Sequence, residues 1–112
     1  MRIFIIALLL VWGGEALAED YSSANYNLPG CQDFVEGTKV ASDIEVGFCV
    51  GRVGGIWSML TVFEEVCSPK GVTNKQIVQV IIQYITQRPA RMHERFDLLA
   101  LEALRLAWPC EK

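Results

Sequence analysis

The cysteines constrain this sequence more than any other feature. All four, Cys31, Cys49, Cys67 and Cys110, follow an N-terminal segment with the form of a removable export signal. Exported thiols enter an oxidising compartment, where an even number of cysteines indicates disulfides. Their wide spacing contains no C-x-x-C pair of the kind that zinc sites use. We therefore expect two disulfides, with no metal site and no cofactor.

Residues 1–18 have the pattern of a secretory signal peptide. A single cation, Arg2, precedes the apolar run Ile3–Trp12, and small residues end the segment at Ala18. The run has about half of the roughly 20 residues that a membrane-spanning helix needs, so we expect cleavage and no stable membrane insertion. Removing 18 of the 112 residues leaves 94, enough for one domain with a marginal core.

The apolar residues repeat at helical spacing, which predicts an all-α, small disulfide-linked four-helix domain. Ser42 with Glu45, and Thr73 with Gln76, have the spacing of capping boxes, and each pair opens an apolar run. Prolines and glycines end the runs. We expect a polar lead over residues 19–28 and then, within a domain of residues 29–112, helices at about 30–36, 42–65, 73–88 and 94–107.

This helix map selects one of the three ways to pair four cysteines. Cys49 and Cys67 lie at the two ends of one helix, about 27 Å apart, and cannot be joined. If the first two helices form an antiparallel hairpin, Cys31 lies level with Cys49, and alternating helix directions return Cys110 to the level of Cys67. We predict the pairs Cys31–Cys49 and Cys67–Cys110, each worth roughly 3 to 4 kcal/mol.

The second helix contains a row of small residues at Gly47, Gly51 and Gly55. Glycine within a helix costs about 1 kcal/mol relative to alanine, so the row predicts close approach of a neighbouring backbone. The same spacing occurs in membrane helices, but Arg52 would then lie in mid-span, and a buried central helix is the favoured interpretation. Its core positions are expected to be Val46, Cys49, Val50, Val53, Ile56, Trp57, Leu60 and Phe63.

No motif in the sequence suggests catalysis. A nucleophile activated by His93, the one histidine, would need a free thiol, whereas export is expected to place all four thiols in disulfides. The carboxylates at Glu64, Glu65, Glu94 and Asp97 are interpreted as solvated helix faces rather than as an acid/base pair. The net charge of −3 argues against nucleic acid, which attracts basic surfaces. We interpret the protein as noncatalytic.

The turn before the fourth helix is the candidate partner-binding site. It gathers cations on an otherwise acidic protein, and its proline lowers the ordering cost of binding. The candidate residues are Arg88, Arg91, Met92, His93 and Arg95. Charge reversal at Arg88 and Arg91 is expected to weaken binding with little change in melting temperature.

The alternative is that this turn is only structural. In that case His93 caps or packs against a helix start, and the arginines form weak surface pairs with acidic residues at the same end of the bundle. Those partners would be Glu36, Asp43 and Glu45. The next candidate surface is the exposed side of the third helix, around Lys75, Gln79 and Gln83.

From residue 28 to the end, the chain carries an ordered set of short motifs. They are Leu28-Pro29-Gly30-Cys31, Gly47-Phe48-Cys49-Val50-Gly51 with Gly55, Cys67, Gly71-Val72-Thr73 with Gln76, Tyr84, Pro89, His93, Leu101-Glu102-Ala103-Leu104 and Trp108-Pro109-Cys110. This set resembles the Rap/Tai family, the resistance-associated and type VI secretion amidase immunity proteins of Gram-negative bacteria. The resemblance implies a periplasmic, all-helical, frequently homodimeric protein without catalytic residues. Its partner would be a peptidoglycan amidase of the NlpC/P60 type, which it binds and blocks.

Two other functions remain open at the level of sequence. One is a periplasmic structural or chaperone-like adaptor, since small disulfide-linked helical proteins can serve in that way by exposing apolar surface. The other is a membrane-tethered subunit, if residues 1–18 are retained as an anchor. An adjacent gene for an NlpC/P60-type amidase would favour the immunity function over the adaptor.

Overall fold

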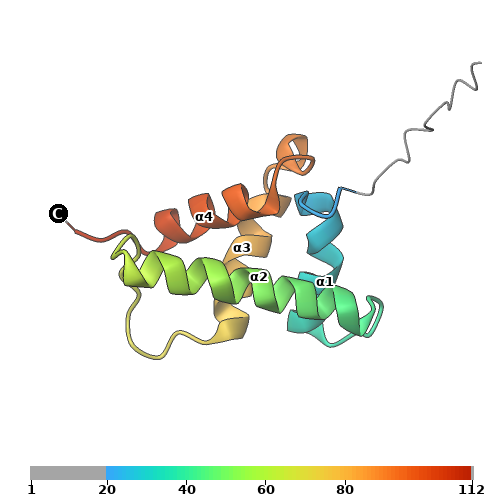
Figure 1. The fold of residues 1–112 in the computed structure, drawn as a ribbon, viewed down its shortest axis with the longest axis horizontal. Coiled ribbons are helices and arrows are strands. Elements are labelled where there is room, and N and C mark those ends of the chain that lie inside the picture. Colours follow the sequence, from blue (N-terminus) through green and yellow to red (C-terminus); the bar gives the residue numbers. More distant parts are fainter. Residues whose placement is uncertain (1–19, 112) are drawn as a thin grey trace, which may run out of the picture.

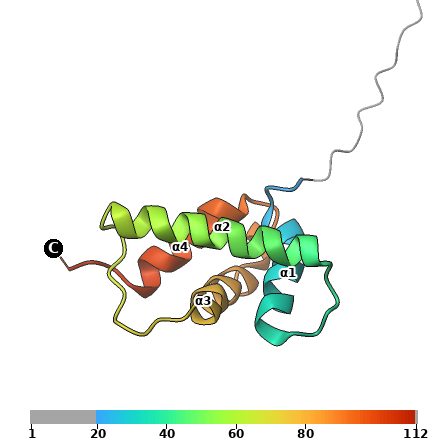
Figure 2. The ribbon, with the colours of Figure 1, turned by 60° about the horizontal axis from the view of Figure 1, so that its bottom comes forward.

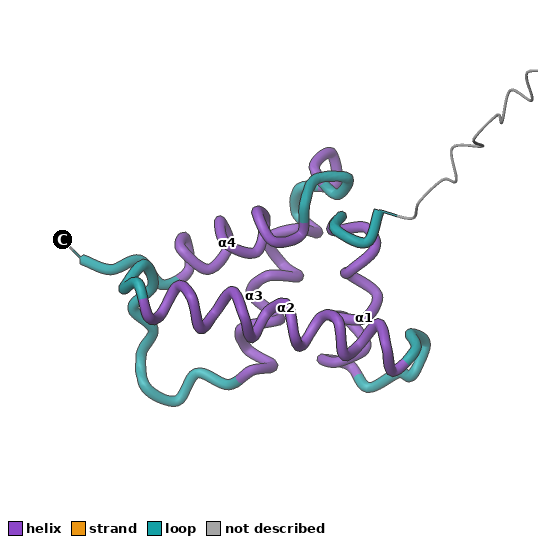
Figure 3. Tube along the Cα trace, in the orientation of Figure 1, coloured by secondary structure: helices purple, strands orange, loops and turns teal. Residues whose placement is uncertain are grey.

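The computed structural model describes residues 20–111 and confirms an all-α domain. The predicted signal peptide lies outside the described residues. Within them the chain forms four α-helices and one turn of 3-10 helix (Figures 1 and 3). These elements are α1 (Ala24–Glu36), α2 (Asp43–Val62), α3 (Asn74–Thr86), η1 (Pro89–Arg91) and α4 (Phe96–Ala107). None of these helices is both long enough and apolar enough to cross a membrane.

Helix α1 begins six residues before its predicted start at residue 30, so half of the predicted polar lead is helical. The Ser23 hydroxyl caps the helix by accepting a hydrogen bond from the Tyr26 N–H at 3.1 Å. Pro29 therefore lies inside the helix rather than in its first turn. A proline there removes one intrahelical hydrogen bond. Bonds from the rest of the fold to the start of the helix, described below, offset that loss.

The end of α1 and the loop after it agree with the sequence signals. Gly37 adopts a left-handed conformation, with φ of 69°, and its N–H donates to the Asp33 carbonyl. The Asp33 carboxylate then accepts hydrogen bonds from the Thr38 hydroxyl and the Lys39 N–H. The Thr38 hydrogen bond is the main reason that the pKa of Asp33 is lowered. One side chain thus fixes the path of the chain from α1 towards α2.

Helix α2 begins with the predicted capping box and ends three residues before its predicted end. The Ser42 hydroxyl accepts from the Glu45 N–H, and the Glu45 carboxylate accepts from the Ser42 N–H. Glu64 has a left-handed φ of 56°, and the Glu65 N–H donates to the Leu60 carbonyl at 2.8 Å. These bonds terminate the helix at Val62 in the manner of a Schellman motif.

The last two helices are each slightly shorter than predicted. The Thr73 hydroxyl caps α3 by accepting from the Gln76 N–H, and α3 ends at Thr86 rather than near residue 88. Helix α4 begins at Phe96 rather than at Glu94, because the residues before it form η1 and a turn. Pro89 ends α3, because it cannot donate a backbone hydrogen bond and disfavours α-helix at the residue before it.

The four helices cross one another rather than packing side by side in alternating directions. In Figure 1, α2 and α4 run in the same direction, and α1 and α3 lie crosswise to them. Helix α1 packs mainly on α2, α3 packs mainly on α4, and α2 with α3 have the smallest contact. The first two helices therefore do not form the antiparallel hairpin that the disulfide argument assumed (Figure 1). The core at this crossing contains Leu60, Val78, Ile81, Ile85, Phe96, Leu99 and Leu104.

Both predicted disulfide pairs are present despite that difference. Cys31 and Cys49 are joined at a Cα–Cα distance of 5.2 Å, and Cys67 and Cys110 at 4.9 Å. Helices α2 and α4 run in the same direction, so the segments that follow them, with Cys67 and Cys110, meet at one end of the molecule (Figure 1). Cys31 and Cys49 meet where α1 packs across α2. A backbone hydrogen bond from the Cys67 N–H to the Trp108 carbonyl, 2.9 Å, joins the same two segments beside the second disulfide.

Helix α2 is not the buried central helix that its glycines predict. Of its predicted core positions, Cys49, Val53 and Leu60 are buried, whereas Val50 and Phe63 are exposed. A Cβ added at any of the four glycines of α2 would meet no atom of the described chain within 4 Å. The close backbone approach occurs instead at Gly30 of α1, where a Cβ would lie 2.2 Å from the Glu45 carbonyl oxygen. The small-residue row therefore faces outward.

Candidate functional site

The candidate site is the segment Arg88–Arg95 between α3 and α4, which we call the α3–α4 turn. Two hydrogen bonds within its own backbone stabilise the turn. The Arg91 N–H donates to the Arg88 carbonyl and the Glu94 N–H donates to the Arg91 carbonyl, both at 2.9 Å. In Figure 1 it lies at the end of the molecule where α1 begins.

The α3–α4 turn is docked on the start of α1. The first N–H groups of a helix have no partner within that helix. Here the Ala24 N–H donates to the Glu94 carbonyl at 2.9 Å, and the Asn25 N–H donates to the Met92 carbonyl at 2.8 Å. In return the Phe96 N–H donates to the Ser22 carbonyl at 2.7 Å. The turn is therefore held in place before any partner arrives, which lowers the entropy cost of binding.

Arg91 is the centre of an ionic cluster within this turn. Its guanidinium donates to both carboxylate oxygens of Glu94, at 2.7 and 3.1 Å, and to both of Glu102, at 2.8 and 3.0 Å. The Tyr84 hydroxyl donates to the same Glu102 carboxylate at 2.6 Å. Such paired, planar contacts are the strong form of the arginine–carboxylate interaction. The cluster joins the turn to α3 and α4.

The hydrogen bonds of the cluster shift the pKa values of its members. The pKa of Glu102 falls to about 2, chiefly because Arg91 and then Tyr84 donate to its ionised form. The pKa of Glu94 is lowered by the Arg91 hydrogen bond, and the pKa of Arg91 is raised by Glu102 and Glu94. Glu102 raises the pKa of the Tyr84 hydroxyl by accepting its proton in a hydrogen bond. At neutral pH these shifts favour the charged forms of Arg91, Glu94 and Glu102 and the neutral form of Tyr84.

The remaining candidate residues differ in how exposed they are to a binding partner. The Arg88 guanidinium lies 3.7 Å from the centroid of the Tyr84 ring and donates to the Tyr84 carbonyl. Arg95 has a side chain that is 70% exposed and forms a long contact of 3.4 Å with Asp97. His93 is exposed, whereas Met92 packs partly against the core. Arg95, His93 and the outer edge of Arg88 are the accessible groups.

Two of the arginines, Arg91 and Arg95, form ion pairs, but not with the carboxylates predicted for them. Glu36, Asp43 and Glu45 lie where α1 ends and α2 begins, whereas the α3–α4 turn lies where α1 starts. The crossing of α1 over α2 separates these two ends. The partners are instead Glu94 and Glu102 for Arg91 and Asp97 for Arg95. Charge reversal at Arg88 and Arg91 is therefore no longer expected to leave the melting temperature unchanged. Replacing Arg91 would remove the cation that pairs with both Glu94 and Glu102 and would disturb the fold.

The family assignment rests on nearly the whole chain. The sequence model of the Rap1a immunity proteins matches residues 14–110. The chain belongs to the Rap1a immunity protein family. This confirms the family that the sequence motifs predict, and it indicates an immunity protein that binds a secreted effector protein. Comparisons with curated proteins and with solved structures gave no significant match.

Two residues that shape this Rap1a-family surface were not identified as site residues from the sequence. Glu102 lies on α4 between the buried Leu99 and Ala103, and a carboxylate on such a face needs a cationic partner. A carboxylate at a partly buried position of an apolar helix could have identified Glu102 from the sequence. Its partner, Arg91, could not be identified in that way, because the pairing depends on how α4 packs beside the turn. Tyr84 is half-buried on α3, and its hydroxyl donates a hydrogen bond to Glu102.

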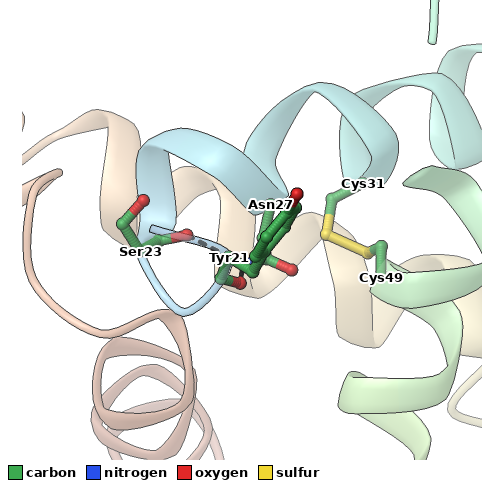
Figure 4. Close-up of a disulfide and its surroundings, with 5 residues drawn as sticks. All are labelled: Tyr21, Ser23, Asn27, Cys31 and Cys49. Atoms are coloured by element: carbon green, nitrogen blue, oxygen red, sulfur yellow. Dashed lines mark hydrogen bonds between the residues drawn. A yellow bond between two sulfur atoms is a disulfide. The ribbon is translucent and has the colours of Figure 1, made fainter. Parts of the chain in front are cut away.

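Asn27 is a third residue that sequence reasoning missed. Its Nδ2 donates to the Tyr21 carbonyl at 3.0 Å and to the Ser23 carbonyl at 2.8 Å, while its Oδ1 is buried with no hydrogen-bond partner in the described part of the chain. Figure 4 shows it on α1 between the N-terminal segment and the Cys31–Cys49 disulfide. Asn27 therefore fastens the segment on which the α3–α4 turn is docked.

The alternative surface on α3 is also accessible. Lys75, Gln79 and Gln83 are all exposed, and the two glutamines line an open groove with Val35 and Glu36 of α1. Amide side chains in such a groove can both donate and accept hydrogen bonds. Across residues 20–111, no three His, Cys, Asp or Glu side chains are grouped so that they could hold a metal ion.

Proposed function

We propose that this protein is a periplasmic immunity protein that binds and blocks a peptidoglycan amidase of the NlpC/P60 type, an effector of type VI secretion. The single observation that carries the proposal is the match of the Rap1a immunity family over residues 14–110. Export is supported by the signal-peptide pattern of residues 1–18 and by two disulfides, which persist in oxidising compartments.

The protein acts by occupying the effector's active site, without a reaction of its own. The α3–α4 turn suits this role, since it is held by α1 and presents Arg95, His93 and part of Arg88 to a partner. Exposed cations at the rim of an interface speed association and select partners with complementary charge. Arg91 organises the turn through its carboxylates rather than contacting the effector directly.

The test measures inhibition of peptidoglycan hydrolysis by an NlpC/P60-type amidase encoded beside this gene. Mature protein, residues 19–112 with its disulfides intact, is expected to inhibit the enzyme and to form a stable complex. Arg88→Ala with Arg95→Ala is expected to weaken the complex by more than about tenfold, the size of effect seen when interface residues that matter are truncated. The matched control is Lys70→Ala, which removes a cation from the loop before α3.

Three results would contradict different parts of the proposal. If the double variant binds as tightly as the unchanged protein, the α3–α4 turn is not the interface, and the α3 groove around Gln79 and Gln83 becomes the surface to test. If the unchanged mature protein neither binds nor inhibits the neighbouring amidase, the amidase target is wrong. If purified protein digests peptidoglycan itself, the noncatalytic role is wrong.

A further inference from the structure

The two disulfides differ in how far solvent can reach them. Cys31 and Cys49 are completely buried, whereas Cys67 is exposed and Cys110 is half-buried. In thiol–disulfide exchange a thiolate attacks a disulfide sulfur, so the rate depends on access to that sulfur. In the folded protein the Cys67–Cys110 bond is therefore open to an attacking thiol, and the Cys31–Cys49 bond is not.

The exposed bond also lies beside an open groove. The volume of the groove is about 450 Å³, within the range of pockets that bind small molecules. Its lining residues are Phe63, Glu64, Glu65, Arg105, Pro109 and Cys110. Figures 1 and 2 both show the end of α2 and the C-terminal segment at the same end of the molecule. A partner can thus approach Cys110 from the groove, where Phe63, 72% exposed, offers an apolar contact.

The exposed bond joins two segments that lie outside the helices. Cys67 is in the loop after α2, and Cys110 follows the end of α4. The Cys67 N–H also donates to the Trp108 carbonyl at 2.9 Å, and the rings of Trp57 and Trp108 meet edge to face, with centroids 5.6 Å apart. These contacts remain when the disulfide opens, and the Cys31–Cys49 bond still joins α1 to α2. Opening the exposed bond therefore breaks no helix.

We propose that Cys67–Cys110 is a site of thiol–disulfide exchange, opened by a dithiol of the kind that thiol–disulfide oxidoreductases carry. A donor thiolate attacks the sulfur of Cys110, which lines the groove. The bond between the two cysteines breaks, and Cys67 leaves as a thiolate that takes up a proton. The donor's second thiol then attacks the donor sulfur of the mixed disulfide and releases Cys110 as a thiol. Two electrons and two protons pass to this protein, and the donor ends as a disulfide.

The charges around the groove select the kind of donor. Glu64 and Glu65 line the groove and Glu111 follows Cys110, while the cation Arg105 is paired with Glu65 at 2.6 Å. This excess of carboxylates repels an anionic thiol and attracts a donor that presents cations beside its thiols. The inference does not depend on the proposed amidase target, because the α3–α4 turn precedes α4 and this bond follows it, about 18 Å away along the helix.

The test follows reduction of the mature protein, residues 19–112, by dithiothreitol in native buffer. Free thiols are trapped with iodoacetamide at successive times and located by peptide mass spectrometry. Cys67 and Cys110 are expected to be alkylated at least about tenfold faster than Cys31 and Cys49, since only the first pair is accessible. In urea the two bonds are expected to be reduced at rates within a few-fold of each other, because unfolding exposes both. Oxidised glutathione is expected to restore the Cys67–Cys110 bond.

The first control is Cys67→Ser with Cys110→Ser, which keeps the buried disulfide. This variant is expected to stay folded by circular dichroism and to resist dithiothreitol over the time in which the unchanged protein loses its exposed bond. Reduction of the variant at that rate would show that opening the exposed bond unfolds the domain, which would contradict a local site.

A second measurement tests entry through the groove. The rates of mixed-disulfide formation are compared for cysteamine, a cationic thiol, and 2-mercaptoethanesulfonate, an anionic thiol. The ratio of the two rates is expected to fall several-fold in the variant Glu64→Gln with Glu111→Gln, because carboxylates beside the sulfur are removed. The matched control is Glu36→Gln with Asp43→Asn, which removes two exposed carboxylates at the other end of α2 and is expected to leave the ratio unchanged.

The proposal is overturned if both bonds are reduced at equal rates in native buffer, or if Cys31–Cys49 is reduced first. It is also overturned if four thiols appear together without a two-thiol intermediate, since reduction would then require unfolding of the whole domain. Selectivity that persists in urea would show that access in the fold is not its cause. A rate ratio that does not change in the Glu64 and Glu111 variant would exclude the groove as the route of attack.

Discussion

Replacing Gly30 by alanine tests the close packing of α1 on α2. Alanine is the better helix former by about 1 kcal/mol, so helix propensity alone predicts a more stable protein. In the structure, however, the added Cβ would lie 2.2 Å from the Glu45 carbonyl oxygen and 2.5 Å from its carbon. Both atoms belong to the backbone of α2, so no side-chain rotation relieves the overlap. The two arguments predict opposite signs.

The clash is expected to outweigh the propensity. Inserting a methyl group into a packed site costs typically 1 to 3 kcal/mol, and the upper value applies because backbone must move. The Cys31–Cys49 disulfide, adjacent to Gly30, restrains the two helices from separating. After subtracting the propensity gain, the net loss is about 2 kcal/mol, which corresponds to a melting temperature lower by roughly 8 to 16 °C for a domain of this size.

The assay is thermal unfolding followed by circular dichroism, on material whose two disulfides are verified by mass. The matched control is Gly54→Ala on α2, where a Cβ meets nothing within 4 Å. That change is expected to raise stability by up to about 1 kcal/mol. If Gly30→Ala melts at or above the temperature of the unchanged protein, the close crossing of α1 and α2 at this residue is refuted.

Three further changes probe other parts of the fold. Cys67→Ser with Cys110→Ser opens a loop of 43 residues and is expected to lower the free energy of unfolding by about 4 kcal/mol; a loss below about 1 kcal/mol in urea unfolding would contradict this. Because the pKa of Glu102 is depressed from 4.5 to about 2, its contribution to the free energy of unfolding is present above about pH 4.5 and is lost as the pH falls towards 2. The melting temperature of Glu102→Gln should therefore fall less over this acid range than that of the unchanged protein. Parallel plots of melting temperature against pH for the two proteins would contradict this. Asn27→Ala removes two hydrogen bonds, one buried and one partly buried, and is expected to cost about 2 kcal/mol. Asn25→Ala, at an exposed position of the same helix, should leave the melting temperature within a few degrees.

Sequence alone determined the features that depend on neighbouring residues. The apolar spacing of three and four fixes the helices, and Ser42 with Glu45 fixes the start of α2 through bonds between residues three apart. The length of the second helix excludes a Cys49–Cys67 bond from the sequence alone. The choice between the two remaining pairings rested on an antiparallel hairpin, which the structure replaces with crossed helices (Figure 1). The family resemblance was also read from short local motifs, and the family model that matches residues 14–110 confirms it.

Tertiary structure alone decided which residues meet across the crossings of the helices. Ser23 caps the start of α1 locally, but the Glu94 and Met92 carbonyls that accept from its first N–H groups come from the α3–α4 turn, which no residue near Ala24 predicts. Arg91 likewise pairs with Glu102 because α4 packs beside the turn. The glycines of α2 predict from the sequence that a neighbouring backbone lies close, but no atom of the described chain lies there. Only the packed structure shows that the described chain leaves this face open, because the angle at which helices cross is set by the whole core rather than by any one segment.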